Sequence, residues 1–226
     1  MARPQLQTAM TFPFSAVLFD LDGTLVDSAS DIAEAVNRML VELGLPRVPE
    51  ARILGWIGEG AHQLITSALR DAGSTLEADA VYARFMVHYE ACLLLDPRLY
   101  DGVVDTLQTL RDRGVRMAVC TNKPSRFVPP LLAAMGIDGY FEGVVGGDSL
   151  AWRKPDPRPL LHLAAQLDVE PARCLMVGDS ETDFAAARAA GMPVVLVSYG
   201  YPRSFDLHAA GALAVIDRFG ELLGLE

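Results

Sequence analysis

Cysteine and long hydrophobic runs are scarce in this sequence, and each scarcity excludes a class of protein. Only three cysteines occur among 226 residues, namely Cys92, Cys120 and Cys174. An odd and sparse set does not form a disulfide framework, and it fits a reducing cytoplasm better than a secreted location. No apolar run approaches the ~20 residues that a helix needs to span a bilayer. We therefore expect a cytoplasmic protein without a membrane segment.

Positive charge is scarce as well. The formal net charge is -10, and lysine and arginine form no basic run. A protein that binds nucleic acid needs cations to replace the counterions of the phosphates, so nucleic acid is excluded as a partner. An anionic membrane surface is disfavoured for the same reason. A small phosphorylated metabolite fits, because a few local cations or a bound metal can outweigh the overall charge.

Hydrophobic residues are plentiful, and their pattern predicts a parallel sheet. They make up 51% of the chain, which is enough for a sizeable core. Short β-branched runs alternate with helical segments, such as the stripe of Val104, Leu107 and Leu110. This alternation favours an α/β fold in which helices cover both faces of a parallel sheet. The predicted strands are 16–19, 115–120, 144–145, 174–177, 194–197 and 213–216.

One interval breaks this alternation. Roughly ninety residues separate the first two predicted strands, whereas a complete strand–helix–strand unit needs only ~30. The stretch is helical by pattern: Ser28 and Asp31 could form a capping box, and hydrophobic stripes follow them. We therefore predict an all-helical subdomain at residues 27–96, inserted into a core formed by residues 1–26 and 97–226.

Polar side chains follow three of the predicted strands. Asp20 and Asp22 come directly after the first strand, Thr121 and Asn122 after the second, and Asp179 after the fourth. The carboxyl ends of parallel strands meet at one edge of a sheet, where α/β folds place their ligands. Side chains two apart in a strand point the same way, so Asp20 and Asp22 would need a cation or a shared proton.

Two more residues join this set, although each has a simpler explanation when taken alone. Lys154 precedes Pro155 in a predicted loop and could be a solvated surface lysine. Asp183 stands three residues after Ser180 and could simply complete a capping box. Chance does not readily place all of these groups at strand ends and the loops that follow. The sequence therefore predicts one shared site.

The order of these groups resembles the haloacid dehalogenase superfamily, in particular its phosphatases. The matching positions, in the order of the four family motifs, are Asp20-Leu21-Asp22-Gly23-Thr24, then Thr121, then Lys154, then Gly178-Asp179 with Asp183. The resemblance covers nearly the whole chain from Ser15. It implies a Rossmann-like core with the catalytic strand at its centre and the helical insert as a cap.

The resemblance also implies the chemistry of a phosphatase. Mg²⁺ would be held by Asp20, Asp179 and the backbone carbonyl of Asp22, and an all-oxygen site suits this hard cation. Asp20 would attack phosphorus and form an aspartyl phosphate. Asp22 would protonate the leaving alkoxide and then deprotonate the water that opens the intermediate.

Further roles follow for the remaining motif residues. Thr121 and the backbone amide of Asn122 would bind phosphoryl oxygens, and Lys154 would offset charge on the nucleophile and the phosphate. Asp183 would not bind the metal itself, but would orient Lys154 or a metal-bound water.

The choice of substrate falls to the cap. Glycines around Gly58 would let backbone amides approach a ligand, and a helix that begins near Glu59 or Gly60 could aim N–H groups at a carboxylate. The same loop could equally be an ordinary linker between helices. The cap length and this loop look like those of phosphoglycolate phosphatases. That likeness implies a small phosphate monoester as the substrate, with 2-phosphoglycolate as the first choice.

Several other activities share the same core and stay open. They are other sugar-phosphate phosphatases, a pyrophosphatase and a β-phosphoglucomutase-like enzyme. A dehalogenase is disfavoured because that branch typically lacks the second acid, here Asp22. A phospho-accepting receiver-like signalling domain is the non-enzyme alternative. Its acceptor normally lies on a middle strand and its acidic pair on the first strand, whereas here the acids are divided between the first and fourth predicted strands. Both a monomer and a homodimer fit the sequence.

Overall fold

A computed structural model describes residues 12–225 of the chain. Its core is a six-stranded sheet in which every neighbouring pair of strands is parallel. The predicted α/β class is thereby confirmed, and the predicted strands match the observed ones to within one or two residues. In sheet order the strands are β5 (Gly143–Val145), β4 (Arg116–Cys120), β1 (Ala16–Phe19), β6 (Cys174–Gly178), β7 (Val194–Val197) and β8 (Ala214–Ile216).

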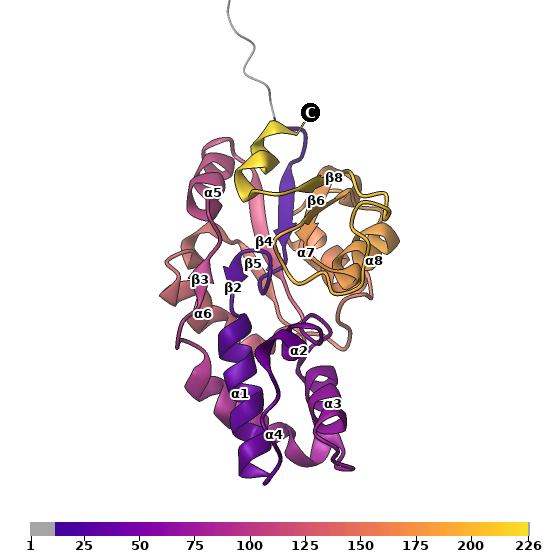
Figure 1. Cartoon of the computed structure of the whole chain (residues 1–226). Coiled ribbons are helices and arrows are strands. Elements are labelled where there is room, and N and C mark those ends of the chain that lie inside the picture. The colour runs from indigo at the N-terminus through magenta and orange to yellow at the C-terminus, as the bar shows by residue number, and fades with distance from the viewer. Residues whose placement is uncertain (1–11, 226) are drawn as a thin grey trace, which may run out of the picture.

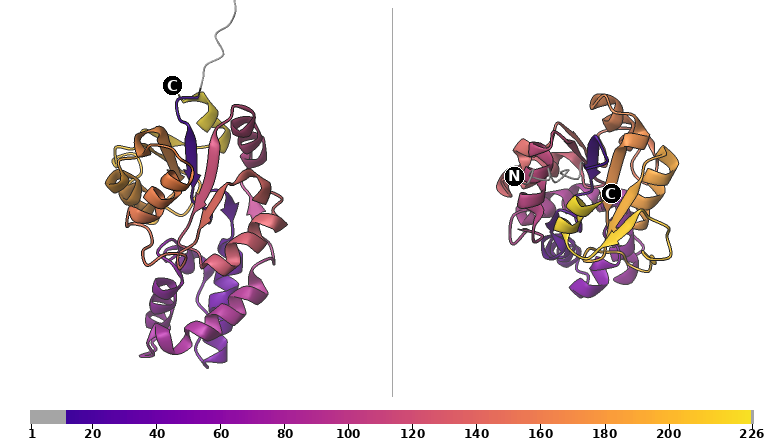
Figure 2. Two further views of the ribbon diagram at one scale, coloured as in Figure 1. Left: turned by 180° about the vertical axis from the view of Figure 1, so that it is seen from behind. Right: turned by 90° about the horizontal axis from the view of Figure 1, so that it is seen from above.

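Helices cover both faces of this sheet (Figures 1 and 2). On one side lie α5 (Val103–Asp112) and α6 (Val128–Ala134), and on the other lie α7 (Arg158–Gln166) and α8 (Glu181–Ala190). Short 3-10 helices add to the connections: η1 (Ser125–Phe127), η2 (Asp138–Tyr140), η3 (Pro171–Arg173) and η4 (Phe219–Gly224).

The central strand β1 is buried from both sides. Val17 and Phe19 belong to one hydrophobic cluster, and Ala16 and Leu18 belong to the other. All four residues are fully buried, since successive side chains of a strand point to opposite faces and both faces are covered. Its carboxyl end therefore lies at the middle of the sheet edge, between the ends of β4 and β6.

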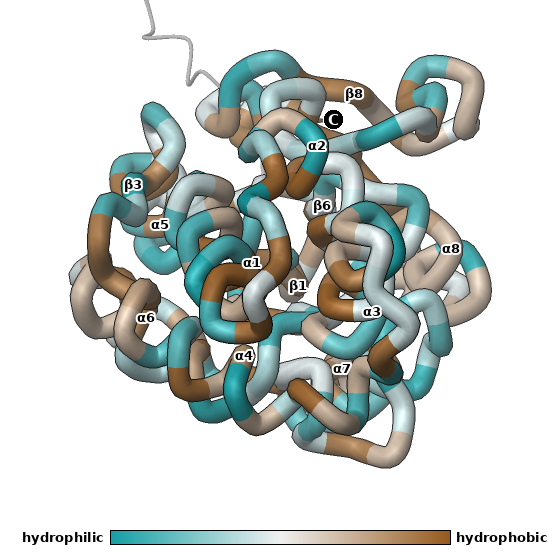
Figure 3. The backbone as a smooth tube through the Cα atoms, turned by 60° about the horizontal axis from the view of Figure 1, so that its bottom comes forward, coloured by the Kyte–Doolittle hydropathy of each residue, from teal (hydrophilic) through white to brown (hydrophobic). Residues whose placement is uncertain are grey.

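The long interval after β1 is helical, as predicted from the sequence. A short antiparallel ribbon of β2 (Val26–Asp27) and β3 (Arg98–Leu99) brackets it. Between these strands lie α1 (Ala29–Glu42), α2 (Glu50–Leu54), α3 (Ala61–Asp71) and α4 (Ala78–Cys92). The four helices lie beyond the carboxyl edge of the sheet, and hydrophobic and hydrophilic segments alternate along α1 (Figures 1 and 3).

The limits of this unit stay a prediction. The proposed division at residues 27 and 96 falls at the β2–β3 ribbon. Residues 1–11, which the prediction assigned to the core, lie outside the described residues.

Two local predictions are wrong. Ser28 precedes α1, but its hydroxyl donates to Asp22 at 2.6 Å instead of capping the helix, and Asp31 accepts from the backbone N–H of Asp96. In α5 the buried stripe begins at Val103, so Val104 is 43% exposed. The buried face of α5 is formed by Val103, Thr106, Leu107 and Leu110, so Leu107 and Leu110 of the predicted stripe are buried and Val104 is not.

The remaining expectations about composition concern cysteine and membranes. Cys92, Cys120 and Cys174 are free thiols and all are buried. Within residues 12–225, none of the helices combines the length and the apolar character that crossing a bilayer requires.

Candidate active site

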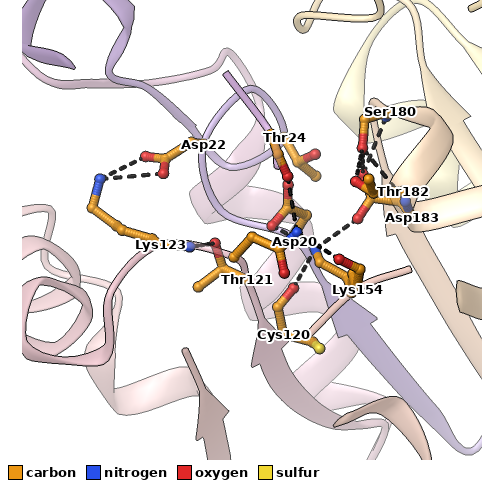
Figure 4. A network of polar contacts seen from close by, with 12 residues as sticks. Asp20, Asp22, Thr24, Cys120, Thr121, Lys123, Lys154, Ser180, Thr182 and Asp183 are labelled. Atoms are coloured by element: carbon orange, nitrogen blue, oxygen red, sulfur yellow. Dashed lines mark hydrogen bonds and ion pairs between the residues drawn. The ribbon is translucent and has the colours of Figure 1, made fainter. Parts of the chain in front are cut away.

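A buried lysine stands at the centre of the predicted site (Figure 4). Lys154 is 2% exposed, and its Nζ lies 2.6 Å from Asp183 Oδ1 and 2.7 Å from Asp20 Oδ1. It also donates to the carbonyl oxygen of Cys120 at 2.6 Å. Burial alone would lower the pKa of Lys154, but the charges of Asp183 and Asp20 outweigh burial and raise it. Lys154 is therefore a fixed ammonium ion beside Asp20.

The two carboxylates that contact this ammonium ion belong to a cluster of three buried carboxylates. Asp20, Asp179 and Asp183 each offer an oxygen, and these oxygens all lie within 4.8 Å of one another. Burial raises the pKa of Asp20 to about 7, with Lys154 opposing the shift and Asp183 adding to it. Burial, then the charges of Asp183 and Asp20, raise the pKa of Asp179 as well. One lysine does not balance three acids in a buried site.

The donor set fits a hard divalent cation. All of the clustered groups are carboxylate oxygens, which Mg²⁺ prefers. Asp20 Oδ1 accepts no hydrogen bond from the described residues, although Lys154 stands close by. A second cation at this cluster would relieve the repulsion that raises the pKa of Asp179.

Asp179 is held in place by residues that the sequence did not single out for this purpose. Thr24 Oγ1 donates to its Oδ1 at 3.2 Å, and the backbone N–H of Tyr201 donates to its Oδ2 at 2.6 Å. Gly23 approaches the same carboxylate, because a Cβ at this glycine would stand 2.3 Å from Asp179 Oδ2. The turn after β1 and the loop after β7 thus fix the orientation of Asp179.

Asp183 has both of the roles that were weighed for it. It completes a capping box with Ser180 at the start of α8. Its Oδ1 also accepts from Lys154 at 2.6 Å. The two contacts use different oxygens, because Oδ2 takes the hydrogen bonds from Ser180. The cap of α8 therefore also positions the lysine.

Asp22 points away from Asp20, which contradicts the expectation that the two side chains share a direction. Strand β1 ends at Phe19, and Asp22 lies in the following turn, so strand alternation no longer applies. Its carboxylate lies 2.9 and 3.2 Å from Lys123 Nζ (Figure 4). Asp22 is therefore outside the carboxylate cluster, although it lines the same pocket as Asp20.

Lys123 is a residue of the site that the sequence analysis missed. It is 4% exposed, and it also donates to the hydroxyl of Tyr89 on α4. A signal was present: Lys123 and Lys154 are the only two lysines among 226 residues, beside 17 arginines. Both lysines are buried at this one site.

The remaining predicted residues also reach the pocket. Thr121 is buried, and its Oγ1 accepts from the backbone N–H of Lys123 at 3.1 Å, which leaves the hydroxyl proton free to donate. Asn122 Nδ2 donates to the carbonyl oxygens of Gly58 and Lys154, each at 2.9 Å. Gly58, Thr121 and Asn122 line the pocket that holds Asp20 and Asp22.

The α2–α3 loop faces this pocket from the helical side. Gly60 precedes α3, which begins at Ala61, so the helix starts where the sequence suggested. Gly58, Gly60 and Ala61 line the pocket together with Trp56 and Leu64. The pocket thus has a polar floor at the sheet edge and a largely apolar roof from the inserted helices.

Comparison with known proteins agrees with this arrangement. Residues 14–191 match a hydrolase family described as haloacid dehalogenase-like. The chain is 44% identical over 214 residues to a phosphoglycolate phosphatase of Colwellia psychrerythraea, a match that spans 92% of this chain and 94% of the relative. It is 45% identical over 218 residues to the plasmid-encoded phosphoglycolate phosphatase of Cupriavidus necator, spanning 96% and 94%.

Solved structures show the same architecture. A predicted phosphoglycolate phosphatase from Haemophilus somnus superposes with a TM-score of 0.89 at 36% identity, over 94% of this chain and 97% of that one. CbbY from Rhodobacter sphaeroides, in complex with phosphate, superposes with a TM-score of 0.80 at 26% identity, over 92% and 96%.

Proposed function

The chain belongs to the haloacid dehalogenase-like hydrolases, and from this membership we propose that it hydrolyses 2-phosphoglycolate to glycolate and phosphate with the help of Mg²⁺. The observation that carries the proposal is the buried cluster around Asp20, where one fixed ammonium ion and two further carboxylates adjoin a pocket. The substrate is taken from the relatives named phosphoglycolate phosphatase.

Asp20 is the proposed nucleophile. Its carboxylate would attack phosphorus in line, the bond to the ester oxygen would break, and an aspartyl phosphate would form. A nucleophilic carboxylate must be ionised, yet burial raises the pKa of Asp20 to about 7. Lys154 at 2.7 Å favours the ionised form. Mg²⁺, when bound, would add positive charge to the nucleophile and to the phosphoryl oxygens.

The proposed ligands of Mg²⁺ are the Asp20 and Asp179 carboxylates and the backbone carbonyl of Asp22. The first two belong to the observed carboxylate cluster. Asp183 would stay outside the coordination sphere, because its two oxygens already serve Lys154 and the cap of α8. It would act by holding Lys154 in position.

Asp22 is the proposed general acid and base. It lines the pocket with Asp20, and its side chain is 12% exposed, so it can reach a bound substrate. It would protonate the departing alkoxide and then take a proton from the water that opens the aspartyl phosphate. Thr121 and the backbone amide of Asn122 would donate to the phosphoryl oxygens during both steps.

The inserted helices are proposed to act as a cap that shields this chemistry from water. The loop at Gly58 reaches the sheet edge, where Asn122 binds its carbonyl oxygen. The β2–β3 ribbon is the proposed hinge, since it is the covalent link between the two parts. A cytoplasmic location, and the choice between monomer and homodimer, stay predictions.

A phosphate-release assay with the Asp20→Asn variant tests the proposed mechanism. In Mg²⁺ buffer with 2-phosphoglycolate, we expect the rate to fall below about one-thousandth of the wild-type rate, because the amide is not a nucleophile. Asp168→Asn is the matched control, because Asp168 is an exposed aspartate that follows α7 and does not line the pocket. Substantial turnover by a folded Asp20→Asn protein would end the mechanism.

A substrate panel separates the alternatives. Preference for pyrophosphate would replace the proposed substrate and leave the mechanism intact. Retention of phosphate on a sugar, with a bisphosphate primer required, would indicate a mutase. A single phosphorylation event without turnover would indicate a receiver-like domain.

A further inference from the structure

Lys123 is a buried cation whose position calls for an explanation beyond stability. Its side chain is 1% exposed, and it pairs with Asp22 and donates to Tyr89, whose ring centroid lies 4.7 Å from Nζ. Replacing a buried ion pair by apolar side chains is often neutral or stabilising, so stability alone does not explain why a pair is placed here. A role of Lys123 in the pocket explains its buried position better.

The pocket offers little positive charge for an anionic substrate. Among the described residues that line it, Lys123 is the only cationic side chain, since Lys154 lies beneath Asp20. Lys154 is already shared by Asp20 and Asp183 and belongs to the phosphoryl end of the site. Lys123 is therefore the cation of the pocket lining that a carboxylate next to the substrate's phosphate can meet. Lys123 directly follows Thr121 and Asn122, the proposed phosphate-binding residues.

We propose that Lys123 binds the substrate's carboxylate, and that the Asp22 carboxylate occupies this place in the free protein. The inference rests on the proposed function and extends it to the residue that recognises the substrate. Asp22 stands in for the ligand, because a carboxylate already contacts Lys123 Nζ with both oxygens, at 2.9 and 3.2 Å.

Binding of substrate would then release the general acid. An arriving carboxylate takes over the contact with Lys123, and the freed Asp22 carboxylate takes up a proton from water and turns toward the ester oxygen. Tyr89 keeps Lys123 in place during this exchange, because its hydroxyl accepts from the same ammonium group. Recognition of the carboxylate and positioning of the proton donor are thereby one event. A phosphate ester without a carboxylate leaves Asp22 on Lys123.

Substitution of Lys123 tests this with two substrates. The measured quantity is kcat/KM for 2-phosphoglycolate divided by kcat/KM for p-nitrophenyl phosphate, which has no carboxylate and a good leaving group. In Lys123→Met we expect this ratio to fall by about 10- to 100-fold, the range for one hydrogen bond to a charged group. Lys123→Arg, which keeps the charge, should fall between this variant and the wild type.

The matched control is another cation of the same loop. Arg126 donates to the carbonyl oxygen of Met86, does not line the pocket and is 48% exposed. We expect Arg126→Met to keep the ratio within about twofold of the wild-type value, since an exposed charge contributes little. Equal losses on both substrates in a folded Lys123→Met protein would show that Lys123 only supports the fold, and the proposal would be rejected.

A second measurement does not depend on how Lys123→Met folds. The chain has only two lysines, so lysine-selective isotope labelling gives two side-chain NMR signals to assign. In Asp20→Asn protein we expect 2-phosphoglycolate to shift the Lys123 signal, and inorganic phosphate to leave it in place. A Lys123 signal that 2-phosphoglycolate does not move overturns the proposal.

The two hypotheses fail in different ways. A wild-type protein that hydrolyses neither ester contradicts the proposed function itself. A wild-type protein that prefers 2-phosphoglycolate, with a ratio unchanged by Lys123→Met, contradicts only the role of Lys123. The carboxylate would then be bound elsewhere, with the start of α3 as the next place to examine.

Discussion

Asp20 and Lys154 are held together in a space that water hardly reaches. Asp20 is 6% exposed and Lys154 is 2% exposed, and the charges of Asp179 and Asp183 lie within the same cluster. Each removal of a charged group from water costs free energy unless another charge compensates. The metal-free protein therefore carries an excess of negative charge at its centre, and this excess has a measurable effect.

Stability of the metal-free protein should fall as the pH rises between about 4 and about 7. Asp20 has an ordinary pKa of 3.8, which burial raises to about 7 in the folded state. Between these values the folded state binds more protons than the unfolded state, so rising pH favours unfolding. The slope from one carboxyl group is at most about 1.4 kcal/mol per pH unit. Urea unfolding at several pH values in the presence of a chelator measures this dependence of the free energy of unfolding on pH.

Two controls accompany this measurement. Excess Mg²⁺ should flatten the dependence and raise the free energy of unfolding, because an ion held by the proposed site would bind only the folded state. Asp20→Asn removes the titrating group and should also flatten the pH dependence of the free energy of unfolding. An unchanged slope in both controls would assign the effect to other groups.

Single residues were the hardest to place from the sequence. Asp20, Thr121, Lys154 and Asp179 were found because each stands at a strand end or in a following loop, and the parallel topology brings these together. Lys123 was missed, since one lysine after a strand looks like a surface residue. Its burial depends on Tyr89, which comes from a helix distant in sequence.

Among the elements, the turn after β1 has no room for a side chain at Gly23. Gly23 has a φ of +88°, and a Cβ there would stand 2.3 Å from Asp179 Oδ2. Gly44, after α1, has a similar φ of +73° but nothing within 4 Å of the same position. Comparing a substitution at Gly23 with the same substitution at Gly44 therefore separates the cost of backbone strain from the cost of a steric clash.

Gly23→Ala should therefore be more harmful than Gly44→Ala. The shared strain costs about 1 kcal/mol or somewhat more in each protein. Only Gly23→Ala also displaces Asp179, so we expect a larger loss of stability and weaker Mg²⁺ binding in this variant alone. Denaturant unfolding and calorimetric titration of Mg²⁺ measure the two effects. Equal losses in both proteins would show that the turn can adjust.

Elements were predicted more reliably than caps. The strands of the core are short apolar runs, such as Val194–Val197, because both of their faces are buried. The start of α1 was misjudged, since Ser28 and Asp31 have the right spacing for a capping box but bind Asp22 and Asp96 instead. Local spacing does not reveal a tertiary partner that competes for the same side chain.

At the scale of the molecule, one set of polar contacts joins the α2–α3 loop and the β2–β3 ribbon to the loops of the core. Asn122 binds the carbonyl oxygen of Gly58 in the α2–α3 loop. Glu59, in the same loop, forms an ion pair with Arg203 in the segment after β7. Tyr201, two residues away, donates to Asp27 at 2.5 Å and accepts from the backbone N–H of Ser28. This segment thus contacts the α2–α3 loop, the β2–β3 ribbon and Asp179.

Arg203→Met should loosen this connection without unfolding the protein. We expect faster amide hydrogen exchange at residues 55–61, while the free energy of unfolding changes by less than about 1 kcal/mol, because a partly exposed ion pair contributes little. Arg218→Met is the control, since Arg218 pairs locally with Glu221 in an exposed position. Unchanged exchange at residues 55–61 would contradict a fastening role for Arg203.

The ion pair between Lys154 and Asp183 has a chemical consequence for the proposed intermediate. An acyl phosphate on Asp20 would form within reach of a primary amine, since Lys154 Nζ lies 2.7 Å from this carboxylate. A neutral amine would attack the activated carbonyl, break its bond to the phosphate oxygen, expel phosphate and leave a stable amide between the two side chains. Asp183 raises the pKa of Lys154, so the nitrogen keeps its third proton and has no lone pair to offer. If Asp20 forms an aspartyl phosphate, the cap of α8 would thereby protect the enzyme from self-acylation.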